Sequence, residues 1–496
     1  MFTVATVGRC HRGLLLDEVL VQIFQRSSHT TLAKAAIVCR AWNEPALRIL
    51  WEWVDLRDFL NIFGRVKWEN DSLRFDGGCA ERSLDRLTLY GSWIKSLFLI
   101  QWLHNTLMDE LRTAIAQLPQ PLLPLLHDLE ISFLDPVPEE TDVSHALVFA
   151  GPTLRKLWFM PHYKKITSAF CMQLLTLSPF LEELTLFIDN VIESSTIAAV
   201  IKMLAHLPAL RLVDIEAVAS NHLIHAILPV LAGHKCLEEL RIKDINVASY
   251  SVPTHHGGFA SLRHVLSVSC PGISSFLKSL PSISELTVVD AHMSSRAVTE
   301  FIQVISTFKR LKSLVFEGNV GGSESPPVDA LLPLRLCSML ETLSIIMFPP
   351  IPMHDNDLEA LLSHLPRLIS FTTGSPWQGD LTDRPNLTLR ALVIITASCP
   401  MIRFISIKLD ASKNADHAMV YHPTLLNQID VQRSYIEDTE AVARFLARLP
   451  ASAALKLEYH NMMNGHEGQW KEVGVGLSLF QDARDRGASL ARVAGA

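Results

Sequence analysis

The chain has 496 residues, of which 49% are hydrophobic and 19% are charged, and its formal net charge is −7 at pH 7. Lysines and arginines form no cluster, which argues against nucleic-acid binding because that role needs a concentrated positive surface. The eight cysteines occur singly, without a CxxC pair, as is typical of a reducing compartment. The longest apolar runs, 223–231 and 391–397, are shorter than the roughly 18 residues that span a membrane. These features predict a soluble protein of the cytoplasm or nucleus, with neither a membrane nor a nucleic acid as partner.

Residues 14–51 carry apolar side chains at helical spacing. Asp17 and Glu18 stand where the first turn of a helix favours acids, and the first apolar stripe follows them. A polar break at 27–31 precedes a second stripe, and a third stripe ends at Trp51. Three helices this short cannot bury so many aliphatic and aromatic side chains, so we expect a partner to cover them.

The order of these residues resembles the F-box family. That family runs from a Leu-Pro pair and two acids through Leu-x-x-Ile-Phe to Val-Cys-Arg-x-Trp and a Leu-Trp pair; here Leu16 stands in place of the proline. The resemblance implies docking onto the Skp-type adaptor of a Skp–cullin–F-box (SCF) ubiquitin ligase, and through it onto a cullin. The residues that it implies for adaptor binding are Leu15, Leu16, Ile23, Phe24, Leu32, Val38, Cys39 and Trp42.

Residues 1–56 are therefore predicted as a three-helix F-box domain. The alternative is that these helices only cap the repeats that follow, since repeat arrays need capped ends. Residues 57–82 mix charges and glycines with apolar side chains, which predicts a packed linker. Those apolar side chains are Phe59, Ile62, Phe63 and Trp68.

Residues 83–460 repeat one pattern: an apolar residue, a second one three positions later, and a third two positions after that. The first positions are Leu84, Leu126, Leu154, Leu181, Leu210, Leu237, Leu262, Ile283, Leu311, Leu340, Leu368, Ile402, Leu426 and Ser452. Proline stands two residues before eight of these fourteen positions, whereas the 26 prolines of the chain predict fewer than one such coincidence by chance. This excess indicates a true repeat.

Each repeat is predicted as one helix and one strand. Proline ends a helix because it lacks an N–H group and clashes with the preceding turn, and the alternation that follows favours a strand. The pattern resembles leucine-rich repeats of the long, helix-bearing type. This resemblance implies an α/β fold, a curved solenoid with parallel strands on the concave face and helices on the convex face. Residues 461–496 are predicted as a C-terminal cap with a mobile end.

An F-box followed by such repeats resembles substrate receptors of fungi and plants, in which the array binds a target protein. Strand residues that alternate with the buried positions would face the target. Trp158, Met160, Phe187 and Phe404 are candidate anchors, because aromatic side chains dominate binding energy at interfaces. Arg241 and Lys243 could pair with an acidic partner. The alternatives are that the aromatic residues pack on neighbouring strands and that the cations are only solvated.

Motifs for catalysis are not apparent. The pairs His222/His225 and His255/His256 lack the further ligands of a metal site, and neither a glycine-rich phosphate loop nor a Gly-x-Ser-x-Gly turn occurs. We therefore predict no catalysis and no cofactor, and a substrate-recognition role in a ubiquitin ligase. The other hypotheses are a repeat scaffold without a ubiquitin role, and a hydrolase or metalloenzyme on an unrecognised fold.

Overall fold

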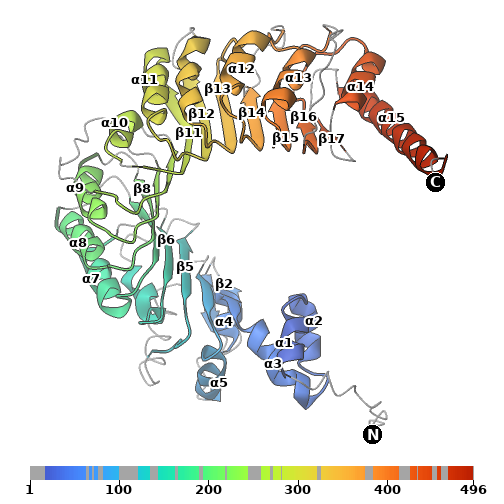
Figure 1. Ribbon diagram of the computed structural model, residues 1–496. Coiled ribbons are helices and arrows are strands. Elements are labelled where there is room, and N and C mark those ends of the chain that lie inside the picture. Colours follow the sequence, from blue (N-terminus) through green and yellow to red (C-terminus); the bar gives the residue numbers. More distant parts are fainter. Residues whose placement is uncertain are drawn as a thin grey trace, which may run out of the picture. The chain divides into compact units, whose positions relative to one another are not determined.

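The computed structural model describes residues 17–62, 66–69, 72–75, 82–99, 121–133, 143–161, 166–188, 194–217, 221–243, 258–268, 272–280, 282–320, 325–374, 384–412, 425–432, 434–449, 455–459 and 467–494. The chain divides into two compact units, unit 1 (Met1–Leu237) and unit 2 (Glu238–Ala496). In both units strands alternate with helices along the chain (Figure 1).

Unit 1 begins with a bundle of three helices, α1 (Asp17–Phe24), α2 (His29–Ala35) and α3 (Arg40–Leu50). Ser28 caps α2, because its hydroxyl accepts a hydrogen bond from the backbone N–H of Thr31 at 3.3 Å. The core of the bundle consists of Leu20, Phe24, Leu32, Ala35, Ala36 and Ala46, against which Trp42, Leu47, Ile49 and Leu50 pack. The bundle thus has a hydrophobic core of its own.

A parallel sheet follows in unit 1. Its strands are β1 (Trp53–Asp55), β4 (Ser96–Leu99), β5 (Asp128–Phe133), β6 (Lys156–Pro161), β7 (Glu183–Ile188) and β8 (Leu212–Ala217), paired in that order. Between them lie α4 (Leu56–Asn61), α5 (Arg82–Gly91), η2 (Val143–Phe149), α7 (Ser168–Leu177) and α8 (Ser194–Ala205), and α9 (Asn221–Ala232) follows β8. Strands β2 (Val66–Glu69) and β3 (Ser72–Phe75) form a separate antiparallel hairpin. Strand β1 directly follows the three helices, inside the segment 1–56 that is predicted as a three-helix F-box domain.

Unit 2 continues the alternation. Its parallel strands, in order, are β9 (Glu239–Lys243), β10 (His264–Val268), β11 (Glu285–Met293), β12 (Ser313–Val320), β13 (Thr342–Phe348), β14 (Ser370–Gly374), β15 (Phe404–Ile407), β16 (Gln428–Asp430) and β17 (Lys456–Glu458). Its helices are α10 (Ile273–Leu277), α11 (Ser295–Ile305), η3 (Val328–Leu336), α12 (Asp355–Leu362), α13 (Leu389–Ser398), α14 (Thr439–Arg448) and α15 (Glu467–Ala494).

The repeated leucines explain where the strands lie. In the copy that starts at Leu181, the pattern residues Leu181, Leu184 and Leu186 are all fully buried, and β7 begins two residues after the first of them. The same offset of two residues holds for every copy from Leu126 to Leu426. One side of each strand therefore packs into the core, and its alternate residues face outward.

The marker prolines lie where helices end. Helix α7 ends at Leu177, two residues before Pro179, and α13 ends at Ser398, two residues before Pro400. The helices α7, α8 and α9 lie on one side of the unit 1 strands (Figure 1). The predicted α/β fold, a helical bundle followed by a solenoid of strand and helix repeats, is confirmed.

The two ends of the repeat pattern differ from the prediction. Leu84 was predicted to start the first strand, but it lies in α5, and the first strand of the pattern follows Ile94 instead. A spacing of three also fits one turn of a helix, so the apolar residues after Leu84 matched by coincidence. At the other end Leu457 pairs with Ile429, which places the start of the last copy at position 454 rather than at Ser452.

The C-terminal segment forms one helix, α15, from Glu467 to Ala494. Helix α15 packs on α14. Trp470 is fully buried, and its indole Nε1 donates a hydrogen bond to the backbone oxygen of Ser434 at 3.0 Å. This residue anchors the first turn of α15 to the last repeats.

Candidate partner-binding surfaces

The helical bundle presents apolar side chains to solvent. Ile23 on α1 is 44% exposed, and Ile37 and Val38 in the turn between α2 and α3 are 85% and 62% exposed. Val19 is also exposed and lies one helical turn before Ile23, on the same face of α1. Exposed aliphatic residues in these positions suit a protein partner.

The residues predicted for adaptor binding divide into three groups. Leu15 and Leu16 lie outside the described residues. Ile23, Val38 and Cys39 are exposed, as a contact residue must be.

The third group lies in the bundle itself. Phe24 and Leu32 belong to its core, where Phe24 is only 3% exposed. Trp42 is half-buried and packs edge-to-face on Phe24, with 5.7 Å between the ring centroids. A partner cannot reach Phe24 or Leu32 while the bundle is folded, so their role in the structure is to hold the helices together. The sequence match could not separate this group from the exposed one, because both follow the same family pattern.

The bundle joins the sheet of unit 1 through aromatic side chains. Trp51, which follows α3, stacks on Tyr90 of α5 with 4.6 Å between the ring centroids. A cavity of about 350 Å³ lies at this joint, lined by Trp51, Trp53, Asp58, Tyr90 and neighbouring residues. Burial raises the pKa of Asp58, and the nearby carboxylate of Asp55 raises it further. The joint is a packed contact between the bundle and the first strands.

The outward face of the unit 1 sheet contains three of the residues predicted to anchor a target. Trp158 is 47% exposed and Met160 is half-buried. Phe187 is only 8% exposed, so it offers little surface to a target, and its role as an anchor stays a prediction. The hydrophobic pattern of β7 continues to the end of the strand, and alternation alone does not tell an exposed aromatic residue from a covered one.

This face also carries charged side chains. The amine of Lys156 lies 2.8 Å from a carboxylate oxygen of Glu183, and this hydrogen bond is the largest cause that raises the pKa of Lys156. Burial raises the pKa of Glu130, which lies beside Trp158 in the next strand. The signal in the sequence was available, because acidic residues occupy alternate positions in β5 and β8.

The outward face of unit 2 has a different character. Arg241 donates to a carboxylate oxygen of Glu239 at 2.7 Å, so its charge is already paired within β9. Lys243 and Phe404 are half-buried. The outward positions of β12 to β15 include six hydroxyl residues, namely Ser313, Thr342, Ser344, Ser370, Thr372 and Ser406.

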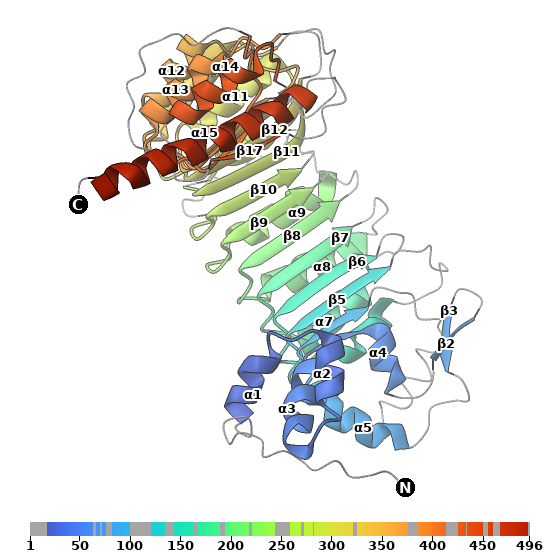
Figure 2. The ribbon, with the colours of Figure 1, turned by 90° about the vertical axis from the view of Figure 1, so that its right-hand side faces the viewer.

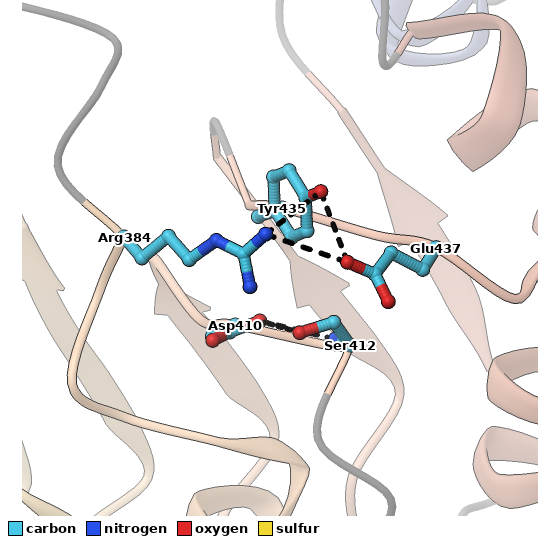
Figure 3. A network of polar contacts seen from close by, with 5 residues as sticks. All are labelled: Arg384, Asp410, Ser412, Tyr435 and Glu437. Carbon is cyan, nitrogen blue, oxygen red and sulfur yellow. Dashed lines mark hydrogen bonds and ion pairs between the residues drawn. The ribbon is translucent and has the colours of Figure 1, made fainter.

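Unit 2 also contains a cavity of about 560 Å³ at the carboxyl ends of β13 and β14. Its lining is rich in proline and methionine and includes Met347, Met353, Arg384 and Leu387. The guanidinium of Arg384 lies 4.3 Å from the ring centroid of Tyr435 and donates to its hydroxyl oxygen at 3.1 Å (Figure 3).

The same polar network holds two carboxylates. Arg384 also contacts Glu437 at 3.4 Å, and Ser412 donates its hydroxyl proton to the buried Asp410 at 2.5 Å (Figure 3). The Arg384 side chain thus bridges two segments that are distant in sequence, and it forms part of the cavity wall.

No group of three or more histidine, cysteine, aspartate or glutamate side chains is placed to hold a metal ion within the described ranges. His222 and His225 lie in α9, where their side chains are not described, and His255 and His256 lie outside the described residues. Within the part of the chain that the structure describes, every helix is too short or too polar to cross a membrane.

A family model described as F-box-like matches residues 17–57. The match covers the three helices of the bundle, β1 and the start of α4. A comparison with curated proteins found no match. The chain therefore carries an F-box-like domain, and the resemblance inferred from the sequence pattern is confirmed for this domain.

Proposed function

We propose that this protein is the substrate-recognition subunit of an SCF-type ubiquitin ligase. The observation that carries the proposal is the F-box-like match to the helical bundle, because F-box domains generally bind Skp-type adaptors. The adaptor would link the bundle to a cullin, and the repeats would hold a target protein.

The bundle has the properties that a docking domain requires. Its own core lets it fold as a distinct element beside the repeats. Its apolar residues Ile23, Ile37 and Val38 remain exposed, and covering them by an adaptor would remove apolar surface from water. We assign adaptor contact to these three residues.

The proposed mechanism is proximity. Two binding events, one on the bundle and one on the repeats, raise the effective concentration of the target near the ubiquitin-charged enzyme. This role asks for binding surfaces in the chain and for no catalytic group of its own.

The test is copurification of the full-length protein with the Skp-type adaptor. The double variant Ile37→Asp, Val38→Asp should lose the adaptor, because it places two charges in the contact, while its melting temperature stays unchanged since both residues are exposed. The matched control is Leu336→Asp, which changes an exposed apolar residue of η3 in unit 2. Undiminished adaptor binding by the double variant would contradict the assignment.

The alternative is a repeat scaffold for which the bundle is only a cap. It is favoured by the stacking of Trp51 on Tyr90, which ties the bundle to the first repeats. Under this alternative, Leu32→Asp, which disrupts the core of the bundle, would also lower the hydrogen-exchange protection of β4 to β6. Under the ligase proposal only the bundle and its joint with the sheet lose protection, because the bundle has a core of its own.

A further inference from the structure

The parallel register of unit 1 aligns outward-facing side chains in rows across the sheet. The central row consists of Asp55, Phe98, Glu130, Trp158, Thr185 and Asp214, one from each of β1, β4, β5, β6, β7 and β8. Neighbouring strands in a sheet are about 4.8 Å apart. Phe98 therefore lies between two carboxylates, and Glu130 lies between two aromatic rings.

The aromatic side chains of this face are accessible. Trp53, in β1, is 60% exposed, and its ring lies 4.8 Å from that of Phe98, measured between centroids. Trp158 is nearly half exposed further along the sheet. Figure 2 shows β5 to β8 side by side, with α7 and α8 behind them, so the helices do not cover this face.

The face is strongly acidic. Its outward strand positions hold the carboxylates of Asp55, Asp128, Glu130, Glu183 and Glu216, and Asp214 lies at a further outward position but is only 4% exposed. Lys156 is the one amine at the described outward positions of these strands, and it is paired with Glu183. The hydrogen bond to Glu183 is the largest cause that raises the pKa of Lys156, and burial alone raises the pKa of Glu130.

The acidity is a local property and does not follow from the net charge of the chain alone. In unit 2 the described outward positions of β12 to β15 hold one carboxylate, that of Glu317. The other outward positions of these four strands hold uncharged side chains, mainly hydroxyl, aliphatic and aromatic ones. The unit 1 face and these four strands of unit 2 therefore favour different chemistry.

We propose that the unit 1 sheet face binds a segment of a partner protein that is rich in lysine and arginine. Lysine and arginine side chains place their charge over the face of an aromatic ring and donate hydrogen bonds to carboxylates. Aromatic rings and carboxylates alternate along the row from Phe98 to Trp158. Only the identification of this partner as the ligase target rests on the proposed function.

The experiment uses the full-length protein and short fluorescent peptides in which lysine and arginine alternate with serine. A second peptide has glutamine at each cationic position, and a third has glutamate. We expect fluorescence anisotropy to show binding of the cationic peptide only, weakening steeply as salt rises because the contacts are between opposite charges. Binding of the glutamine peptide with equal affinity would overturn the proposal.

Variants locate the binding on the face. Trp158→Ala and Glu130→Gln should each weaken the cationic peptide by roughly 5- to 30-fold, the range expected for losing a cation–π contact or a charge-assisted hydrogen bond. The controls are Phe180→Ala, an exposed aromatic residue in the turn after α7, and Glu317→Gln on the unit 2 face. Equal weakening by the controls would overturn the assignment to this face.

Two further readouts separate this proposal from its alternatives. The Trp158→Ala variant should still copurify with the Skp-type adaptor, since Trp158 is not in the bundle. If the wild-type protein binds the cationic peptide but does not copurify with the adaptor, the ligase role alone is refuted. If the face instead binds a second copy of this chain, Trp158→Ala would change the sedimentation of the protein and leave peptide binding intact, which would overturn the proposal.

Discussion

At the scale of single residues, two neighbours in α1 have opposite surroundings. Phe24 lies in the core of the bundle and Ile23 is exposed. We expect Phe24→Ala to destabilise the bundle by about 3–5 kcal/mol, the usual cost of truncating a buried phenylalanine. Ile23→Asp should change stability by less than about 0.5 kcal/mol and yet weaken adaptor binding. Hydrogen exchange of α1 to α3 measures the stability of the bundle, and copurification measures adaptor binding. If Phe24→Ala keeps full hydrogen-exchange protection of the bundle but no longer binds the adaptor, Phe24 contacts the adaptor directly.

Three buried thiols give the protein a predictable response to alkaline pH. Burial raises the pKa of Cys171 and of Cys399 to about 12, and that of Cys337 to about 11. Unfolded thiols ionise at lower pH, so the unfolded chain releases these protons first as the pH rises. The stability contributed by the neutral thiols is complete below the unfolded pKa and is lost above it, by roughly 1.4 kcal/mol per thiol for each pH unit.

The urea midpoints of both units should therefore fall once the pH passes the ordinary thiol pKa of 9.0. The control is a variant with alanine at all three positions, in which this part of the pH dependence disappears. An equal fall in the triple variant would assign the effect to other groups.

At the scale of elements, α15 depends on one side chain. Trp470 is fully buried and donates a hydrogen bond to Ser434, whereas Val475, less than two turns later, is exposed. Trp470→Ala should cost about 3–5 kcal/mol of stability in the last repeats, because it leaves a cavity and an unpaired carbonyl. Val475→Ala should have almost no effect on the same hydrogen-exchange protection of α14 and α15. Equal hydrogen-exchange protection of α14 and α15 in the two variants would mean that contacts other than those of Trp470 attach α15 to the last repeats.

The element scale also shows what could be predicted from sequence and what could not. The strands from β5 to β16 were predicted because three buried residues and a helix-ending proline recur together. Residues 317–328 are rich in glycine, serine and proline, a composition typical of a loop, yet β12 extends to Val320. A Cβ atom on Gly318 would lie 2.9 Å from the backbone oxygen of Ala291, so this glycine permits the close approach of β12 to β11 and does not mark a turn.

The candidate binding surfaces were predictable only in part. Alternation along a strand identified Trp158 as outward-facing, but it could not show that Phe187 is covered. The alignment of Glu130 between Phe98 and Trp158 depends on the register of three strands, and register needs the pairing of segments that are distant in sequence. A sequence pattern within one repeat therefore cannot predict a surface that is formed by several repeats together.

At the scale of the whole molecule, stability should be local, because each repeat contacts only its neighbours and the bundle has its own core. Leu184→Ala removes a fully buried side chain from β7 and should cost about 2–5 kcal/mol. We expect the loss of hydrogen-exchange protection to centre on β6 to β8 and to leave the bundle unchanged. The matched control, Thr185→Ala, changes the next, outward-facing residue of the same strand and should have little effect. A uniform loss of protection over both units would instead show that the chain unfolds as one cooperative body, and the bundle would then be part of the array and not a separate docking domain.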